Sequence, residues 1–282
     1  MMKVITTSKS MHALLMDWKS EDRKIGFVPT MGALHAGHLS LVSKSKTEND
    51  FTVVSIFVNP NQFNNASDLE KYPRTFEKDK EMLELGGADV LFFPSIKEIY
   101  PEPDLRKFDF GKLEKVMEGE FRPGHFNGVA QVVSRLFNIV QPEKAYFGEK
   151  DFQQLAIIQA MVNQLNLAVE IVPCPIFREV NGLAMSSRNE RLSPEGREKA
   201  KLIYQILADV QSRLASVPIK QLKEEAWQSM EKSGFLKPEY FEVSNAHSLE
   251  PALTIEPGQQ YVICTAVWLE EVRLIDNIRY PK

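Results

Sequence analysis

The stretch "KIGFVPTMGALHAGHLSLVSKS" (24–45) changes its hydrophobic period in the middle. Residues 24–30 form a short, nearly continuous apolar run, which is typical of a parallel strand buried on both faces. From Gly37 onward the apolar residues recur at helical spacing. The stretch therefore predicts a strand that passes into a helix, with two glycines and two histidines at the passage.

The same alternation continues along the first 175 or so residues. We expect strands at 24–30, 51–59, 88–94, 144–149 and 168–177, and helices at 37–50, 74–87, 128–140 and 151–166. Apolar strands that alternate with helices indicate an α/β fold, a Rossmann-like doubly wound parallel sheet with both faces covered. After about residue 193 the pattern changes to helices at 193–215 and 219–234, followed by strands at 238–246, 260–270 and 272–278. This change predicts a smaller α+β domain.

The composition is that of an ordinary soluble globular protein. The 282 residues are 43% hydrophobic and 26% charged, and the formal net charge of −4 argues against a dedicated nucleic-acid-binding protein. No apolar run approaches the ~20 residues that cross a bilayer, and the first residues lack a signal-peptide pattern, so we expect a cytoplasmic protein without a membrane partner. Cys174 and Cys264 are far apart and are expected to be buried, reduced thiols.

The histidines of "HAGH" lie where a phosphate site would form. A helix N-terminus has unpaired N–H groups and a partial positive charge, and glycines such as Gly32 and Gly37 let the backbone approach a ligand. His35 and His38 are three residues apart and share one face of the first turn. Two surface histidines beside a turn are the plain alternative. A zinc site would need a third ligand, which the sequence does not place, and HxxH is not HExxH.

A second polar group follows the fifth expected strand in "MSSRNERLS" (185–193). Ser186 and Ser187 offer hydroxyl groups and Arg188 a permanently charged guanidinium, which together suit a polyphosphate. A solvated surface segment is the alternative.

A third group follows the fourth expected strand in "FGEKDFQQL" (147–155). Gly148 precedes the expected helix, and Lys150, Asp151 and Gln154 share one helical face by their spacing. Any one of these groups also fits a surface segment. Three such groups at strand exits of one domain favour a site for a polyphosphate.

The motifs resemble those of a known enzyme family. "HAGH" is similar to the HIGH signature of nucleotidyltransferases, and "MSSR" resembles their KMSKS-type loop. Together with "FVNPNQF", "RPGHFNGV", "YFGEKDFQQL" and "RLIDN", they resemble the pantothenate synthetases (pantoate–β-alanine ligases) over nearly the whole chain. The resemblance implies a homodimeric ligase that uses ATP and Mg²⁺ to join pantoate to β-alanine through a pantoyl-adenylate, releasing AMP and pyrophosphate. The dimer would form through the N-terminal domain.

The resemblance also implies a domain division and a set of site residues. Residues 1–176 would bind nucleotide and pantoate, and residues 177–282 would form a lid carrying the KMSKS-like loop. Catalysis is expected from His35, His38, Lys150 and Arg188, with His38 as proton donor. Gln62 would bind pantoate and β-alanine, and Gln154 pantoate. The expected ATP-binding residues are Met31, Gly32, Ala33, Leu34, His35, Ala36, Gly37, His38, Gly148, Glu149, Lys150, Asp151, Phe177, Met185, Ser186, Ser187 and Arg188. No ligand of Mg²⁺ is assigned.

Some positions are less clearly placed by the resemblance. Phe177 stands where the family usually has a smaller aliphatic residue, and Asn181 where it often has aspartate. Arg122 and His125 in "RPGHFNG" could reach an anion or organise a dimer contact, and the long connection at 101–124 favours the contact.

Three other functions remain to be distinguished. A plain ATP-binding regulator would bind nucleotide but would release no pyrophosphate with pantoate. A nucleotidyltransferase of coenzyme synthesis would retain the nucleotide on its product and would need no amine. A tRNA-binding synthetase-like protein would carry a larger and more basic C-terminal region than this chain has.

Overall fold

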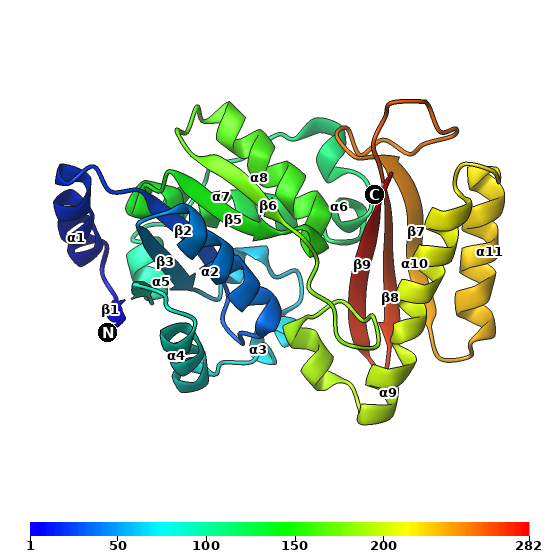
Figure 1. The fold of residues 1–282 in the computed structure, drawn as a ribbon, viewed down its shortest axis with the longest axis horizontal. Helices are drawn as coiled ribbons and strands as arrows, with labels where there is room; N and C mark the ends of the chain where they lie inside the picture. The colour runs from blue at the N-terminus through cyan, green and yellow to red at the C-terminus, as the bar shows by residue number, and fades with distance from the viewer. Residues whose placement is uncertain (282) are drawn as a thin grey trace. The chain divides into compact units, whose positions relative to one another are not determined.

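The computed structural model describes residues 1–281 and divides into two compact units (Figure 1). The first unit comprises Met1–Phe110, Arg122–Glu149 and Gln154–Pro175. The second comprises Gly111–Phe121, Lys150–Gln153 and the chain from Ile176 onward. Two short segments from the middle of the chain therefore belong to the same unit as the C-terminal region.

The first unit is built on a parallel sheet, as the alternating pattern predicts, and the sheet has six strands, one more than the five expected. Its order is β1-β4-β3-β2-β5-β6. The strands are β1 (Lys3–Ile5), β2 (Ile25–Thr30), β3 (Phe51–Ile56), β4 (Val90–Phe92), β5 (Lys144–Gly148) and β6 (Glu170–Cys174). The helices are α1 (Ser8–Ser20), α2 (Ala36–Glu48), α3 (Ala66–Glu70), α4 (Phe76–Leu85), α5 (Ile96–Ile99), α7 (His125–Val140) and α8 (Phe152–Gln164), with 3-10 turns η1 (Pro60–Gln62) and η3 (Glu149–Asp151).

Helices cover β2 from both sides. Val28 packs in one cluster with Leu41 and Val42 of α2. The ring of the neighbouring Phe27 packs edge-on against Phe137 of α7, with the two ring centroids 6.2 Å apart. Adjacent side chains of a strand point to opposite faces, so α2 and α7 lie on opposite faces of the sheet. This arrangement explains why the strand is apolar without interruption.

The strand order identifies the edge of the sheet where a ligand would bind. From β2 the chain moves outward through β3 to β4, and it later returns to β5 on the other side of β2. The connections therefore reverse direction between β2 and β5. In doubly wound sheets the ligand crevice forms at such a reversal, beyond the carboxyl ends of the strands. The ends of β2 and β5 are Thr30 and Gly148.

The second unit contains a three-stranded antiparallel sheet in the order β7-β8-β9, as predicted for the C-terminal region. Helices α10 and α11 pack on it through a core that includes Leu207, Leu222 and Val267. The strands are β7 (Lys237–Asn245), β8 (Tyr261–Leu269) and β9 (Val272–Tyr280); the helices are α6 (Glu118–Phe121), α9 (Pro194–Lys199), α10 (Lys201–Arg213) and α11 (Ile219–Lys232), with η2 (Gly111–Glu114) and η4 (Ser187–Arg191).

An ion pair explains why the segment 111–121 belongs to the second unit. Arg273 of β9 donates hydrogen bonds of 2.8 and 2.7 Å to the two carboxylate oxygens of Glu118. The Tyr240 hydroxyl adds a 3.0 Å hydrogen bond to the same carboxylate. Such bidentate pairs are geometrically specific, and this one fixes α6 against the small sheet.

The structure differs from the sequence prediction at several elements. The edge strand β1 was not predicted, because Lys3–Ile5 is too short to show a period. The helix α1 was also missed, although its buried Met11, Leu15 and Trp18 recur at helical spacing. The single helix predicted at 193–215 is two helices, α9 and α10, separated at Ala200. The prediction that Lys150 and Asp151 share a helical face with Gln154 is wrong in its geometry, because both lie in a 3-10 turn before α8 begins.

Two smaller expectations concern cysteines and membranes. Cys174 and Cys264 are buried and unpaired, which confirms the expectation of free thiols. Burial raises the pKa of the Cys174 thiol to about 11. Within residues 1–281, none of the helices has both the length and the hydropathy of a membrane span.

Candidate functional site

The loop between β2 and α2 turns through two left-handed residues. Gly32 has φ 80° and Ala33 has φ 50°. Glycine adopts this conformation without strain, whereas alanine does so at a cost of about 1 kcal/mol or more. The Thr30 hydroxyl accepts a hydrogen bond from the Gly32 N–H at 3.1 Å and donates to the Ser55 carbonyl oxygen at 2.8 Å. The loop is thus fixed to the ends of two neighbouring strands.

Asp79 of α4 holds the same loop from the other side. Its two carboxylate oxygens accept hydrogen bonds from the N–H groups of Ala33 and Leu34, at 2.9 and 2.8 Å. Its side chain is buried, and the Thr75 hydroxyl donates a further bond to it at 3.1 Å. The role of Asp79 was not predicted from the sequence. The available signal was an acidic side chain at a position of α4 that helical spacing places beside the buried Leu83.

His35 and His38 form a mutual cap at the start of α2. The His35 Nδ1 accepts a hydrogen bond from the Gly37 N–H at 3.2 Å, and the His38 Nδ1 accepts one from the His35 N–H at 3.3 Å. The two ring centroids lie 4.1 Å apart. Because each Nδ1 accepts a hydrogen bond, the proton of each neutral ring is assigned to Nε2. Both Nε2 atoms are therefore donors.

Gln62 at the end of η1 contacts the same loop. Its Nε2 lies 3.1 Å from the sulfur of Met31, and its Oε1 accepts a 3.1 Å hydrogen bond from Asn59 Nδ2. The residue is 8% exposed. Asn59 thereby sets the orientation of the Gln62 amide: the oxygen is occupied, and the amide nitrogen faces the loop. Within the first unit, two predicted site residues, Met31 and Gln62, are brought together.

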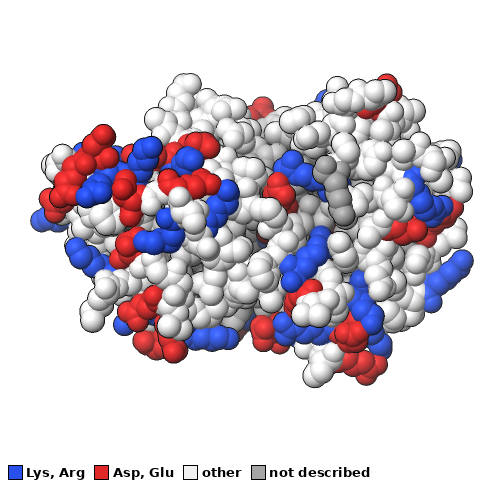
Figure 2. Space-filling model, in the orientation of Figure 1, with Lys and Arg blue, Asp and Glu red and all other residues white. Residues whose placement is uncertain are grey.

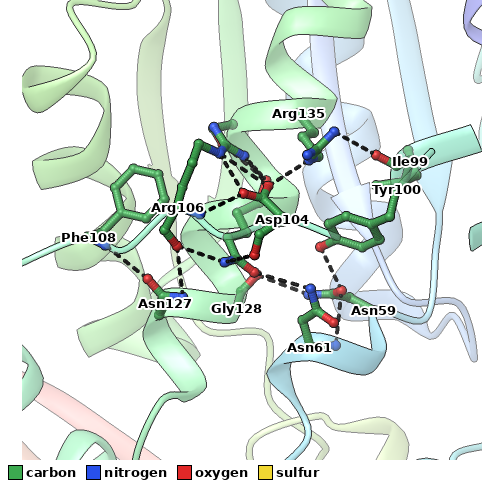
Figure 3. Close-up of polar contacts among 12 residues, drawn as sticks. Asn59, Asn61, Ile99, Tyr100, Asp104, Arg106, Phe108, Asn127, Gly128 and Arg135 are labelled. Atoms are coloured by element: carbon green, nitrogen blue, oxygen red, sulfur yellow. Dashed lines mark hydrogen bonds and ion pairs between the residues drawn. The ribbon is translucent and has the colours of Figure 1, made fainter. Parts of the chain in front are cut away.

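Both the oxygen and the nitrogen of the Asn59 side-chain amide form hydrogen bonds, as Figure 3 shows. Its Oδ1 accepts hydrogen bonds from the Tyr100 hydroxyl at 2.9 Å and from the Asn61 N–H at 3.3 Å. Its Nδ2 also donates to the Gly128 carbonyl oxygen at 3.0 Å. Burial raises the pKa of Tyr100 to about 12, so this hydroxyl remains a donor at neutral pH. Asn59 and Tyr100 were not predicted from the sequence, because their pairing depends on the folded chain.

Gly128 allows α7 to approach η1 closely. A β carbon at this position would lie 2.3 Å from the Asn61 carbonyl oxygen, a backbone atom that cannot easily move. Only glycine therefore fits between the helix and the turn that carries Gln62.

A buried ion cluster anchors the long connection beside this network (Figure 3). Arg106 and Arg135 both donate hydrogen bonds to the Asp104 carboxylate, whose side chain is 1% exposed. These guanidinium groups, Arg106 most strongly, hold the pKa of Asp104 well below its usual range. The Arg135 guanidinium also lies 5.2 Å from the centre of the Tyr100 ring. The connection is therefore fixed to α7 next to Tyr100.

Arg122 and His125 contact the main chain of Gln62. The His125 Nδ1 lies 2.8 Å from the Gln62 carbonyl oxygen, and Arg122 Nη1 lies 3.2 Å from the His125 Nε2. Since a guanidinium only donates, His125 accepts from Arg122 through Nε2 and donates to Gln62 through Nδ1. His125 is 5% exposed and lies against Gln62, a predicted site residue.

The predicted residues of the β5 exit are divided between the two units. Gly148 ends β5 and Glu149 begins η3, both in the first unit, and β5 runs parallel beside β2. Gln154 also belongs to the first unit and is half-buried in α8. Lys150 and Asp151 belong to the second unit.

The remaining predicted residues follow a small hairpin of the second unit. Arg178 and Ala184 form an antiparallel bridge, and the Met185 N–H donates to the Phe177 carbonyl oxygen at 2.9 Å. Gly182, with φ 94°, makes the turn. The Ser186 hydroxyl then caps η4 by accepting from the Arg188 N–H at 3.3 Å.

Glu179 and Asn189 brace this segment. The buried Asn189 donates hydrogen bonds to the Glu179 carboxylate at 2.9 Å and to the Ala184 carbonyl oxygen at 3.1 Å. Arg197 forms a bidentate pair with Glu179 at 2.8 and 2.9 Å. The hydrogen bonds from Arg197 to Glu179 raise the pKa of the guanidinium. These contacts hold the backbone on both sides of residues 186–188 in place.

Other features of the described residues do not provide a competing site. Among residues 1–281, no cluster of three or more His, Cys, Asp and Glu side chains is arranged to hold a metal ion. An open cavity of about 580 Å³ lies at the amino ends of β1 and β3, lined by Lys3, Trp18, Phe51 and Asp89 among others. This is the opposite edge of the sheet from the crevice expected for a ligand. On the face that Figure 2 shows, lysine and arginine mix with aspartate and glutamate over α1 and α4.

Comparison with known proteins gives one consistent result. The sequence model described as Pantoate-beta-alanine ligase matches residues 3–279. A pantothenate synthetase of Bacteroides thetaiotaomicron is 52% identical over 281 residues and 100% of both chains. The crystal structure of a pantothenate synthetase from Thermus thermophilus has a TM-score of 0.91 at 40% identity, over 98% of this chain and 99% of that one.

A third relative was crystallised with ligands. The pantoate–β-alanine ligase of Francisella tularensis, complexed with β-γ ATP and β-alanine, has a TM-score of 0.81 at 37% identity, over 99% of this chain and 97% of that one. The sequence motifs, the parallel sheet and these matches agree. The chain belongs to the pantoate–β-alanine ligase family.

Proposed function

We propose that this protein joins pantoate to β-alanine through a pantoyl-adenylate, consuming ATP and releasing AMP and pyrophosphate. The contact between Met31 and Gln62 carries this proposal most directly, because it brings the expected nucleotide loop beside the expected pantoate residue. The Francisella tularensis relative, complexed with β-γ ATP and β-alanine, supports the same pair of ligands here.

The chemistry explains why ATP is needed. A carboxylate is a poor acyl donor, because its oxygen is a poor leaving group. Attack of the pantoate carboxylate on the α-phosphorus of ATP expels pyrophosphate and forms a mixed anhydride. The amine of β-alanine then attacks the acyl carbon, AMP leaves, and the amine loses a proton. The main barrier of the first step is the approach of two anions, which positive charge and N–H dipoles reduce.

The histidine pair suits this first step. With Nδ1 accepting a backbone hydrogen bond, each ring of His35 and His38 presents Nε2–H as a donor. A donor at the first turn of a helix adds to the positive end of the helix dipole. We infer that the pair binds phosphate oxygens, with His38 donating toward the departing pyrophosphate.

Lys150 and Arg188 supply charge in the proposed mechanism. Lys150 contributes a compact ammonium, and Arg188, which begins η4 with Ser187, contributes a planar guanidinium. Both stabilise the negative charge that builds up on the phosphoryl oxygens. No residue is required as a covalent nucleophile.

Gln62 and Gln154 bind pantoate in this scheme, and Gln62 also borders β-alanine. Because Asn59 occupies Oε1 of Gln62, its Nε2 is the atom available to a pantoate oxygen. The second step then requires only that the amine be held beside the trapped anhydride.

Mg²⁺ fits the donor chemistry as part of the substrate complex. The described residues hold no cluster of three or more candidate ligands, and Mg²⁺ in nucleotide sites is usually held by phosphates, water and at most one or two carboxylates. Phosphate oxygens of ATP and water would thus hold it, and it would offset phosphate charge.

Product analysis with each substrate omitted in turn tests the proposal. We expect pyrophosphate release with ATP and pantoate alone, limited to about one turnover, and AMP release only when β-alanine is added. A nucleotidyltransferase that retains the nucleotide on its product would instead turn over without an amine. That result would contradict the proposal.

Two variants test the residue roles. His38→Ala and Lys150→Ala should each slow pyrophosphate release by about a hundredfold or more, since preorganised donors contribute on that scale. His12→Ala and Lys232→Ala, which change exposed residues, are the matched controls. Wild-type rates in His38→Ala or Lys150→Ala would remove those residues from the mechanism.

A further inference from the structure

The stretch "RLIDN" places two consecutive polar residues inside the small sheet. Asp276 and Asn277 lie on β9, paired with Thr265 and Cys264 of β8, and each is 3% exposed. Consecutive side chains of a strand point to opposite sides, so the two residues reach different parts of the second unit. Burying two polar side chains is costly unless each is hydrogen-bonded.

Asp276 is bonded to the hairpin that precedes Met185. Arg178 donates to its two carboxylate oxygens at 2.7 and 3.0 Å. The same guanidinium donates to the Gly182 carbonyl oxygen at 3.1 Å and to the Asn277 carbonyl oxygen at 3.0 Å, and it lies 4.1 Å from the centre of the Tyr204 ring. Arg178 therefore joins one strand and the turn of the hairpin to β9.

Asn277 is bonded to the turn that carries Lys150. Its Nδ2 donates a 2.9 Å hydrogen bond to the Lys150 carbonyl oxygen. Burial raises the pKa of the Asp276 carboxyl, whereas Arg178 and, to a smaller extent, the Lys150 charge lower it. The main chain of Lys150 is therefore held by the strand that also carries Asp276.

We propose that Asp276 and Asn277 are positioning residues that fix Lys150 and the segment 177–188 relative to each other. The proposal rests on the proposed function, because that function gives Lys150 and Arg188 their roles at the phosphates. Asp276 acts through Arg178 and the hairpin, and Asn277 acts through the Lys150 backbone. Neither residue touches substrate in this scheme.

A purely structural role is the alternative, and the choice of variants separates the two. Asn277→Ala and Asn277→Leu both remove the donor to Lys150, and leucine keeps the side-chain volume. Thr265→Val on β8 is the matched control: its buried hydroxyl donates to the Tyr240 carbonyl oxygen at 2.8 Å, and it has no bond to Lys150. The three variants should lose similar amounts of thermal stability.

Pyrophosphate release with ATP and pantoate is the decisive measurement. We expect kcat for this step to fall about tenfold to a hundredfold in the Asn277 variants, as a small misplacement of a catalytic group does. Pantoate binding measured by calorimetry without ATP should stay unchanged. Thr265→Val should keep its rate within about twofold. Folded Asn277 variants with wild-type kcat would overturn the proposal.

Arg178→Lys is the second variant, in case substitution of Asn277 prevents folding. Lysine keeps the positive charge but cannot bridge two oxygens as guanidinium does. The same loss in kcat supports the proposal, and a wild-type rate contradicts it. If the wild-type protein releases no pyrophosphate with pantoate, the proposed function fails. If it does and Lys150→Ala is slow while the Asn277 and Arg178 variants are not, only the positioning role fails.

Discussion

The Asp79 carboxylate accepts a 2.8 Å hydrogen bond from the main-chain N–H of Leu34. Its other oxygen accepts from Ala33, which has a left-handed backbone conformation. One buried side chain of α4 thus fixes the shape of the loop that carries the histidine pair. The loop is held in this shape by contacts within the first unit.

Replacing Asp79 should therefore destabilise the fold and disturb nucleotide binding. Asp79→Ala leaves two main-chain donors without their acceptor, at about 1–3 kcal/mol for each donor that is buried. Denaturant unfolding measures the loss, and calorimetry with ATP measures the binding. Glu77→Ala, in the same turn of α4 but exposed, should change neither. Equal stability of the two variants would contradict the role given to Asp79.

Reversing the polarity of Gln62 should weaken pantoate binding. In Gln62→Glu one oxygen can still accept from Asn59, but the atom facing the loop becomes an acceptor and repels a carboxylate. Loss of a hydrogen bond to a charged group predicts about tenfold or greater weakening. Calorimetry with pantoate and with ATP separately is the test. An equal effect on both ligands would mean that Gln62 does not discriminate between them.

Removing the Tyr100 hydroxyl should weaken pantoate binding indirectly, through Asn59 and Gln62. Tyr100→Phe removes a donor to Asn59, whose other end orients Gln62. We expect the KM for pantoate to rise severalfold while the KM for ATP stays constant. The control is Tyr146→Phe, which removes a buried hydroxyl bonded to Asn49 and Glu48 in the same unit. If both variants behave alike, the effect is one of general stability.

Lowering the pH should weaken the contacts of Asp104 with Arg106 and Arg135, which anchor the long connection at 101–124. Arg106 and Arg135 lower the pKa of this carboxyl in the folded protein, so its stabilisation is complete above the unfolded value of about 4. The stabilisation is lost as the pH falls below that value toward the folded pKa. Thermal unfolding between pH 7 and 3 should show a flatter dependence for Asp104→Asn than for the wild type. Asp17→Asn, at an exposed position of α1, should follow the wild-type curve.

The sequence predicted the elements whose burial has a regular period. Strand β2 and helix α2 could be found from 24–45, because each keeps its period for at least one full element. The β1 strand has only three residues and carries no such signal. The break at Ala200 was also missed, because the helical spacing continues across it.

The polar partners behind the site could not be predicted in the same way. Tyr100 and Asn59 are 41 residues apart, and Asn277 and Lys150 are 127 residues apart. Neither pair has a local spacing that would reveal it, because the contact depends on how distant strands and turns meet. By contrast, His35 and His38 could be found from their spacing alone, since both lie in one helical turn.

The second unit is assembled from three separate segments of the chain, which limits how this protein can be recombined with its relatives. Glu118 pairs with Arg273, and the Lys150 backbone pairs with Asn277, so β9 is matched to two segments far earlier in the chain. A chimera with a single crossover near residue 176 would join β9 of one parent to the 111–121 and 150–153 segments of the other. Functional hybrids are therefore expected when those short segments are transplanted together with the C-terminal region.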